Sequence, residues 1–175
     1  MALIENIFSL ISMRSFSSLW FWVVVAVYWS AVSRSVLGAP HDMIVRARKG
    51  DAQNLEDLHA LIDITVRRKL RFTRRAGHWS LAFNAALMTV IVILAVQYGL
   101  ELAQALLLLF VPMIIVRLLE LRLAFRIERT NLRGPALCRA LLTHRFWVQA
   151  IGVLAIFATS VWGMLFVMSR SVLGS

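Results

Sequence analysis

Long apolar stretches, separated by basic segments, dominate the pattern of hydrophobic and polar positions along this chain. A helix needs roughly 20 mostly apolar residues to cross the hydrocarbon core of a bilayer, because each residue advances it by about 1.5 Å. Four stretches approach that length, at about residues 19–37, 79–98, 102–121 and 146–168. The pattern therefore predicts an all-α protein built as a four-span transmembrane helical bundle.

The third stretch is the shortest of the four. Its uninterrupted apolar part, residues 102–116, would form a helix of roughly 22 Å, which is less than the thickness of the hydrocarbon core. Pro112 is expected to kink this helix, because the proline ring removes one backbone hydrogen bond. Arg117 can lengthen the span by extending its side chain to the lipid headgroups. A re-entrant hairpin is the alternative interpretation.

Composition supports a membrane protein with a single transmembrane domain. Of the 175 residues, 60% are apolar and 16% are charged, and the mean hydropathy is +0.76. These values exclude an ordinary soluble domain, in which about half of the residues are apolar and about a quarter are charged.

The link near Gly99 is so short that the second and third spans are expected to form an antiparallel hairpin.

Lysine and arginine are concentrated in two connecting segments. Residues 38–77 contain nine of them and residues 117–145 contain seven, whereas the link at residues 99–101 contains none. Cytoplasmic loops of membrane proteins carry an excess of Lys and Arg. We therefore expect cytoplasmic segments at 38–77 and 122–145, and both termini on the periplasmic side of a bacterial inner membrane.

Both cytoplasmic segments are predicted to be amphipathic helical extensions of the spans. Apolar residues recur at helical spacing over residues 55–66, and residues 51–54 offer helix-start chemistry, with Asn54 as a candidate N-cap. The helix that extends the third span should stop at Gly134. We expect the basic side chains of these extensions to bind anionic lipid or a partner protein, because the inner membrane surface is anionic. These residues are Arg67, Arg68, Lys69, Arg71, Arg74, Arg75, Arg122, Arg126, Arg129 and Arg133. Nucleic-acid binding is not expected, because the chain carries no recognition motif.

The first residues predict a further helix. Leu3, Ile4, Ile7, Phe8 and Ile11 share one helical face, which is typical of a helix lying in the membrane interface. The alternative is a first span that starts earlier and tilts. The segment lacks the positively charged start of a removable signal peptide, so we do not expect one.

Small residues recur at the spacing that lets helices approach closely in lipid. The candidates for helix packing are Ala82, Ala86, Gly152, Ala155, Thr159 and Gly163. The pattern fits packing inside one bundle, and it also fits an interface with a second copy of the chain or with another subunit.

Chemistry-bearing motifs are absent from the sequence. The four histidines, His41, His59, His78 and His144, do not pair at metal-ligand spacing, and Cys138 is the only cysteine. No nucleophile elbow or phosphate-binding loop occurs. We therefore expect no catalytic residue, no metal site and no cofactor. Two alternatives are a small channel or transporter subunit that works as an oligomer, and a haem- or quinone-binding protein that uses His78 and His144.

Four scattered segments carry a family resemblance: residues 11–20 (ISMRSFSSLW), 36–43 (VLGAPHDM), 57–61 (DLHAL) and 161–164 (VWGM). In these segments the chain resembles small bacterial integral-membrane proteins named "component of SufBCD complex". The resemblance implies an association with cytosolic iron–sulfur cluster assembly. A single cysteine does not supply the four thiolates that a cluster requires. The implied role is therefore docking by the basic cytoplasmic surface. Together these observations favour a non-enzymatic scaffold, anchor or accessory subunit of the inner membrane.

Overall fold

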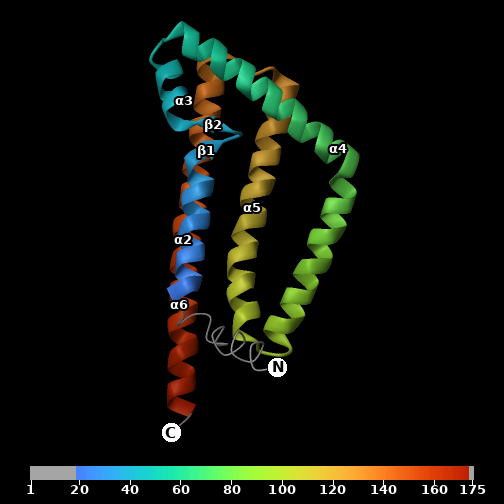
Figure 1. The fold of residues 1–175 in the computed structure, drawn as a ribbon, viewed down its shortest axis with the longest axis vertical. Coiled ribbons are helices and arrows are strands. Elements are labelled where there is room, and N and C mark those ends of the chain that lie inside the picture. Colours follow the sequence, from blue (N-terminus) through green and yellow to red (C-terminus); the bar gives the residue numbers. More distant parts are fainter. Residues whose placement is uncertain (1–18, 174–175) are drawn as a thin grey trace, which may run out of the picture.

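The computed structural model describes residues 19–173, and these residues are almost entirely helical (Figure 1). The elements in chain order are α2 (Leu19–Arg34), β1 (Ser35–Val36), β2 (Ala39–Pro40), α3 (His41–Arg48), α4 (Ala52–Val96), α5 (Glu101–Thr130) and α6 (Gly134–Leu173). The predicted all-α class is confirmed. The helix predicted at the start of the chain lies outside the described residues.

Among the described residues, three helices are long and apolar enough to cross a membrane: α4, α5 and the Gly134–Leu165 part of α6. They contain the predicted second, third and fourth spans. The third is continuous with its predicted extension, because α5 runs unbroken through Pro112 for 30 residues. The described helix α2 has 16 residues and is shorter than a typical span. The fourth crossing of the membrane therefore stays a prediction.

The predicted first span, residues 19–37, ends as a helix three residues early. After Arg34 the chain forms a two-stranded antiparallel hairpin in which Val36 pairs with Ala39. Both central residues of its turn, Leu37 and Gly38, have positive φ angles of 50° and 79°. Two such residues are typical of the tight turn that matches the twist of a hairpin. The Leu37 side chain is fully buried, and its burial offsets the strain of a left-handed leucine.

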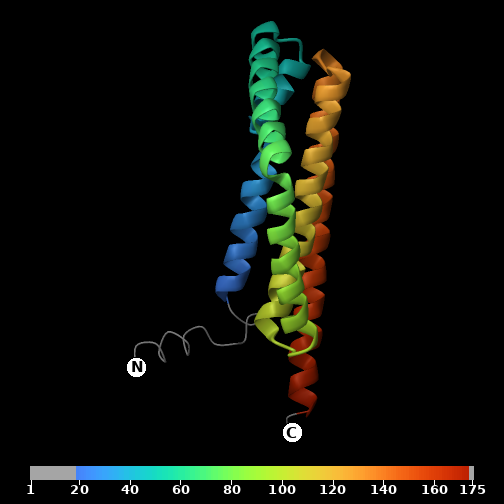
Figure 2. The same cartoon turned by 90° about the vertical axis from the view of Figure 1, so that its right-hand side faces the viewer.

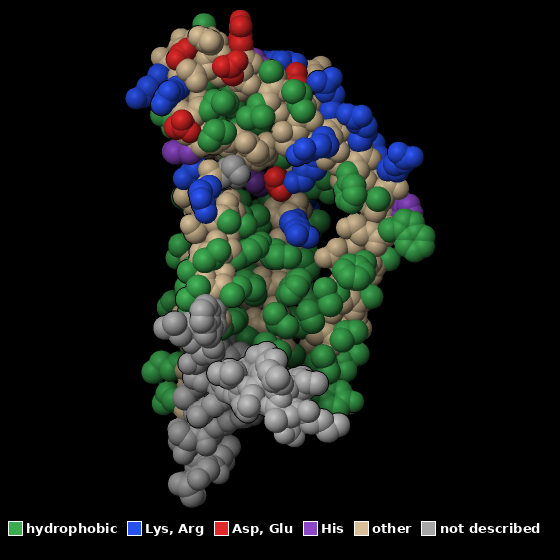
Figure 3. Space-filling model, in the orientation of Figure 1, with side chains coloured by type: hydrophobic (Ala, Val, Ile, Leu, Met, Phe, Trp, Pro, Cys, Tyr) green, Lys and Arg blue, Asp and Glu red, His purple; other side chains and the backbone are tan. Residues whose placement is uncertain are grey.

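The principal hydrophobic core lies among the segments predicted to be cytoplasmic and not among the predicted spans. We call residues 35–75 and 120–145 the head, and the remaining described residues the stem. The buried core of the head consists of Val36, Leu37, Ala39, Ile44, Ala47, Leu58, Ile62, Val66, Leu70, Leu123, Ala124, Ile127, Leu137, Cys138 and Leu141. Figures 1 and 2 show the head stacked on the stem in one elongated body, and Figure 3 shows Lys and Arg gathered at the head end. The residues of the head thus form a packed unit.

Helix α4 joins head and stem without a break. Its N-cap is Asp51, whose side chain accepts a hydrogen bond from the Asn54 backbone N–H at 3.3 Å. The helix thus starts within the predicted range, residues 51–54, but Asp51 and not Asn54 is the cap. The helix crosses the top of the molecule and then turns down along the stem (Figure 1). Near this change of direction the Thr73 hydroxyl donates to the Lys69 carbonyl, and Gly77 follows one turn later. Both features favour helix bending.

The stem half of α4 packs sparsely. Ile91 and Ala95 are its buried residues, whereas Trp79, Leu81 and Phe83 are each about 70% exposed. Exposed apolar side chains on all sides of a helix are typical of contact with lipid. The stem therefore has the surface expected of membrane-embedded helices.

Candidate functional site

Three of the ten predicted binding residues form ion pairs within the head. Lys69 pairs with Glu120, the Arg74 guanidinium lies 2.6 Å from Glu128, and the Arg133 guanidinium lies 2.8 Å from Asp63. These pairs join α4 to α5 and to the connection between α5 and α6. A carboxylate of the fold compensates each of these charges, although the side chains of Arg74 and Arg133 are 62% and 54% exposed.

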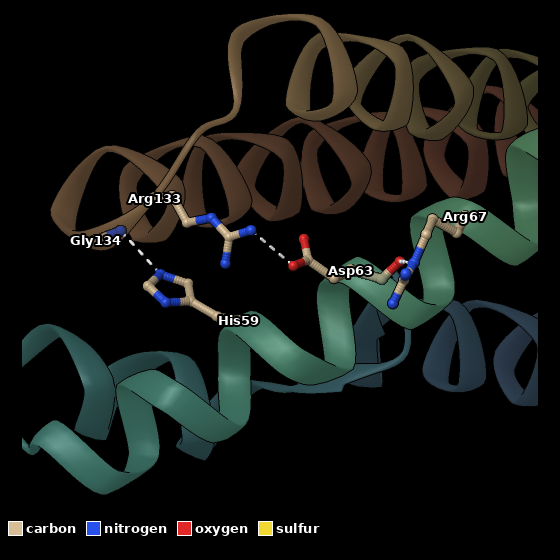
Figure 4. Close-up of polar contacts among 5 residues, drawn as sticks. All are labelled: His59, Asp63, Arg67, Arg133 and Gly134. Atoms are coloured by element: carbon tan, nitrogen blue, oxygen red, sulfur yellow. Dashed lines mark hydrogen bonds and ion pairs between the residues drawn. The ribbon is translucent and has the colours of Figure 1, made fainter.

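The contact of α4 with the α5–α6 connection has a second polar component (Figure 4). The backbone N–H of Gly134 donates to the His59 Nε2 atom at 2.9 Å, one helical turn before Asp63. Arg67 turns its Nε–H to the carbonyl of Asp63 at 3.1 Å. His59 and Asp63 therefore attach α4 to the residues that end one long helix and start the next. The spacing of four between His59 and Asp63 is the sequence signal for this shared face.

Other arginines of α4 point away from the fold. Arg68, Arg71 and Arg75 are exposed and have no ion-pair partner among the described residues. Phe72 lies between them on the helix and is 64% exposed. We call these four residues the basic face. Together with Arg74 and Ala76 they line a shallow hollow of about 800 Å³. The head thus contains exposed cations that are paired with its own carboxylates, such as Arg74, and exposed cations that are not.

The three arginines predicted on α5 have no ion-pair partner among the described residues, and they occupy two different places. Arg122 and Arg126 line an open hollow of about 510 Å³ between α5 and α6. Arg139 of α6 lines the same hollow from the other side. It is not among the ten binding residues predicted from the sequence. Arg129 is exposed on the last turn of α5 and does not line this hollow. Arg122, Arg126 and Arg129 are four and three residues apart on one helix. This spacing does not indicate that a neighbouring helix adds Arg139 to the same hollow.

The predicted packing residues occupy different environments. Gly152 is buried against the Trp29 ring of α2, and Thr159 and Gly163 are buried on the same helix. Ala155 is half-buried and accepts a hydrogen bond from the Thr159 hydroxyl through its backbone carbonyl. Ala82 and Ala86 are exposed on α4 and fill no interface within the described chain. Close helix approach is therefore seen on α6 but not at the two alanines of α4.

At the end of the stem opposite the head, Gln104 links three helices. Its Nε2 atom donates to the Ala95 carbonyl of α4, and its Oε1 atom accepts from the Trp162 indole N–H of α6, each at 3.2 Å. The amide side chain bonds a carbonyl in the last turn of α4, where carbonyls lack partners within the helix, and so joins the three helices. Gln104 is the only polar residue in the apolar part of the third predicted span, residues 102–116. Its two partners lie on other helices, so the sequence alone did not indicate them.

The titratable groups near the head core favour structural roles. Burial raises the pKa of the Cys138 thiol, which leaves less of the reactive thiolate at neutral pH. Hydrogen bonds from Asn54 lower the pKa of the Asp51 carboxyl and favour its charged, capping form.

His144 is buried and lines a cavity of about 200 Å³ with Glu120, whereas His78 is exposed beside Trp79. Within residues 19–173, no cluster of His, Cys, Asp and Glu is arranged to hold a metal ion.

Comparison of the chain with models of protein families, with curated proteins and with solved structures found no match.

Proposed function

We propose that this protein is a non-enzymatic scaffold or accessory subunit of the bacterial inner membrane, and that its basic face docks an acidic partner protein on the cytoplasmic side. The observation that carries the proposal is the sorting of cations in the head. Lys69, Arg74 and Arg133 are neutralised by carboxylates of the fold. Arg68, Arg71 and Arg75 have no such partner among the described residues, so their charge is available to another molecule.

The residue types of the basic face favour a protein partner. Arginine and aromatic side chains are enriched at protein–protein interfaces, where they supply most of the binding energy. Phe72 adds an exposed apolar contact to the hollow that the three arginines of the basic face line. The packed core beneath this helix holds Leu70 and Val66, so the face is presented by a folded surface. A rigid surface loses less conformational entropy on binding than a mobile loop.

The resemblance noted in the sequence supplies the candidate partner. It implies association with the SufBCD iron–sulfur cluster assembly machinery. Docking needs no cluster ligand from this chain, which agrees with its single, buried cysteine. The proposed role is therefore to hold an assembly factor at the membrane surface.

The test is direct binding between the full chain in nanodiscs of zwitterionic lipid and purified SufBCD complex. The variant Arg68→Glu/Arg71→Glu/Arg75→Glu should weaken binding by roughly tenfold or more, because like charges then face the acidic partner. The matched control is Arg46→Glu/Arg48→Glu/Lys49→Glu, which reverses three exposed charges elsewhere on the head and should bind almost normally. Absence of binding by the unmodified chain contradicts this partner, and equal weakening of both variants contradicts docking by the basic face.

Anionic lipid is the competing occupant, and one further measurement separates it from a protein. A polarity-sensitive dye attached to Phe72→Cys should report the same environment in zwitterionic and anionic nanodiscs when no partner is present. A shift in anionic nanodiscs alone would assign the basic face to lipid headgroups instead.

A further inference from the structure

Two hollows lie between α5 and α6, one in the head and one in the stem. The upper hollow has a volume of about 510 Å³. Its polar lining consists of Arg122, Arg126, Arg139, Thr143 and His144, and the remaining lining residues are apolar residues and Trp147. The lower hollow has about 420 Å³, and all of its lining side chains are apolar. The proposed docking on α4 uses neither of them.

The two hollows belong to one seam. On α5, Leu119 lines the upper hollow and Ile115 lines the lower one; on α6, Trp147 lines the upper hollow and Ile151 lines the lower one. Each of these pairs is separated by four residues, and residues four apart lie on the same face of a helix. The seam therefore runs continuously from a basic upper end into an apolar lower end.

This order of chemistry along the seam matches the order of chemistry in a phospholipid. Trp147 lies where the apolar part of α6 begins, and tryptophan prefers the boundary between hydrocarbon and headgroups. The three guanidinium groups lie on the headgroup side of that boundary, and the apolar hollow lies on the hydrocarbon side. We propose that the seam between α5 and α6 binds an anionic phospholipid, with its phosphate among Arg122, Arg126 and Arg139 and an acyl chain along the lower hollow.

The electrostatics of the upper hollow supports an anion. None of the three arginines has an ion-pair partner among the described residues, so their mutual repulsion is uncompensated until an anion arrives. Arginine forms two parallel hydrogen bonds to phosphate, which favours it over lysine for this task. A soluble phosphate would use the upper hollow alone, and an acidic peptide would find no polar partner in the lower one. A lipid is the ligand class that uses both.

The test is native mass spectrometry of the purified full chain in detergent, with phosphatidylglycerol and phosphatidylcholine of equal chain length. The unmodified chain should retain phosphatidylglycerol in preference to phosphatidylcholine. The variant Arg122→Gln/Arg126→Gln/Arg139→Gln should bind phosphatidylglycerol on the order of 100-fold more weakly, at about fivefold for each arginine. The matched control Arg68→Gln/Arg71→Gln/Arg75→Gln, which removes the same charge from α4, should retain the preference.

Two further arms test the lower hollow and the source of the phosphate. Ala158 is exposed and lines the lower hollow, so Ala158→Phe should fill it and weaken retention of long-chain phosphatidylglycerol without harming the fold. Inorganic phosphate should not displace the lipid. Equal retention by the triple glutamine variant and the unmodified chain would overturn the proposal. Unchanged binding by Ala158→Phe would refute the placement of the acyl chain, and displacement by inorganic phosphate would make the upper hollow a soluble-anion site.

Discussion

The six-membered ring of Trp29 packs directly on the backbone of Gly152. A Cβ atom added to Gly152 would lie 2.9 Å from the Cε3 atom of Trp29, which is closer than carbon atoms normally approach. The ring belongs to the buried cluster that Val25, Val116 and Val148 form inside the stem. Helix α2 thus packs on α6 where α6 has no side chain.

Replacing Gly152 by alanine should destabilise the protein by about 1–3 kcal/mol, the usual cost of overpacking a filled site. The reason is that the ring of Trp29 must move away from α6. Thermal unfolding of the purified chain in detergent measures the effect.

Gly77→Ala is the matched control for this substitution. A Cβ atom at Gly77 meets Thr73 at 3.4 Å, an ordinary contact, and alanine favours a helix interior by about 0.5–1 kcal/mol. The control should therefore be neutral or stabilising. A Gly152→Ala protein that melts at or above the temperature of the unmodified chain would show that α2 does not pack as described.

Two ion pairs of the head, Lys69–Glu120 and Arg133–Asp63, should differ in their contribution to stability. Lys69 and Glu120 are 32% and 27% exposed, whereas Arg133 and Asp63 are 54% and 41% exposed. Glu120→Gln should lower the free energy of unfolding by about 1–3 kcal/mol, which lies between the usual values for exposed and buried ion pairs. Asp63→Asn should lower it by at most about 1 kcal/mol. Double-mutant cycles with Lys69→Met and Arg133→Met measure the two coupling energies. Equal couplings would contradict the different burial of the two pairs.

Cys138 should resist thiol reagents in the folded protein. Its raised pKa means that the thiolate forms only at a higher pH than for a free cysteine, and its burial blocks access as well. Maleimide labelling should therefore be slow at neutral pH, become faster as the pH rises, and become complete after denaturation. A cysteine placed at Arg71, which is exposed, provides the reference rate. Labelling of the native Cys138 at that reference rate would show that the head core is open.

The two ends of the molecule should be reached from opposite sides of the membrane. Lys49 lies in the head, and Gln97 lies in the exposed link between α4 and α5. In intact cells, an impermeant thiol reagent should label Gln97→Cys and should label Lys49→Cys only after permeabilisation, because cytoplasmic segments carry the excess of basic residues. Labelling of Lys49→Cys from outside would invert the proposed orientation.

The apolar periodicity was sufficient to predict the long helices. Residues 55–66 indicated an amphipathic helix, and Leu58, Ile62 and Val66 are indeed its buried face. Sequence did not indicate what that face packs against. Ile44 of the short helix α3 is fully buried in the same core, but nothing in its local pattern separates it from a loop residue. Contacts between helices depend on tertiary geometry, which a local pattern does not contain.

The same limit applies to the candidate site. Ten basic residues looked equivalent along the chain, and only the position of α5 shows that Lys69 meets Glu120 and Arg74 meets Glu128. Glu120 also has Arg117 three residues before it, a spacing that would allow a pair within one helix. The pairing with Lys69 on another helix was not readable from that spacing. The sequence around Arg139 likewise does not indicate its place in the upper hollow, because the other two arginines there belong to α5.

The unbroken course of α4 has a mechanical consequence. A single hydrogen-bonded helix connects Leu58 in the head core with Ala95, next to the Gln104 contact at the far end of the stem. The hydrogen bonds between successive turns resist stretching of a helix. A displacement of one end is therefore passed along the helix axis, and no loop interrupts α4 between Leu58 and Ala95. The change of direction near Thr73 divides this connection into two straight parts. A load that tilts the head therefore reaches the far end of the stem through that bend, and the stiffness of the bend decides how far the two ends move together.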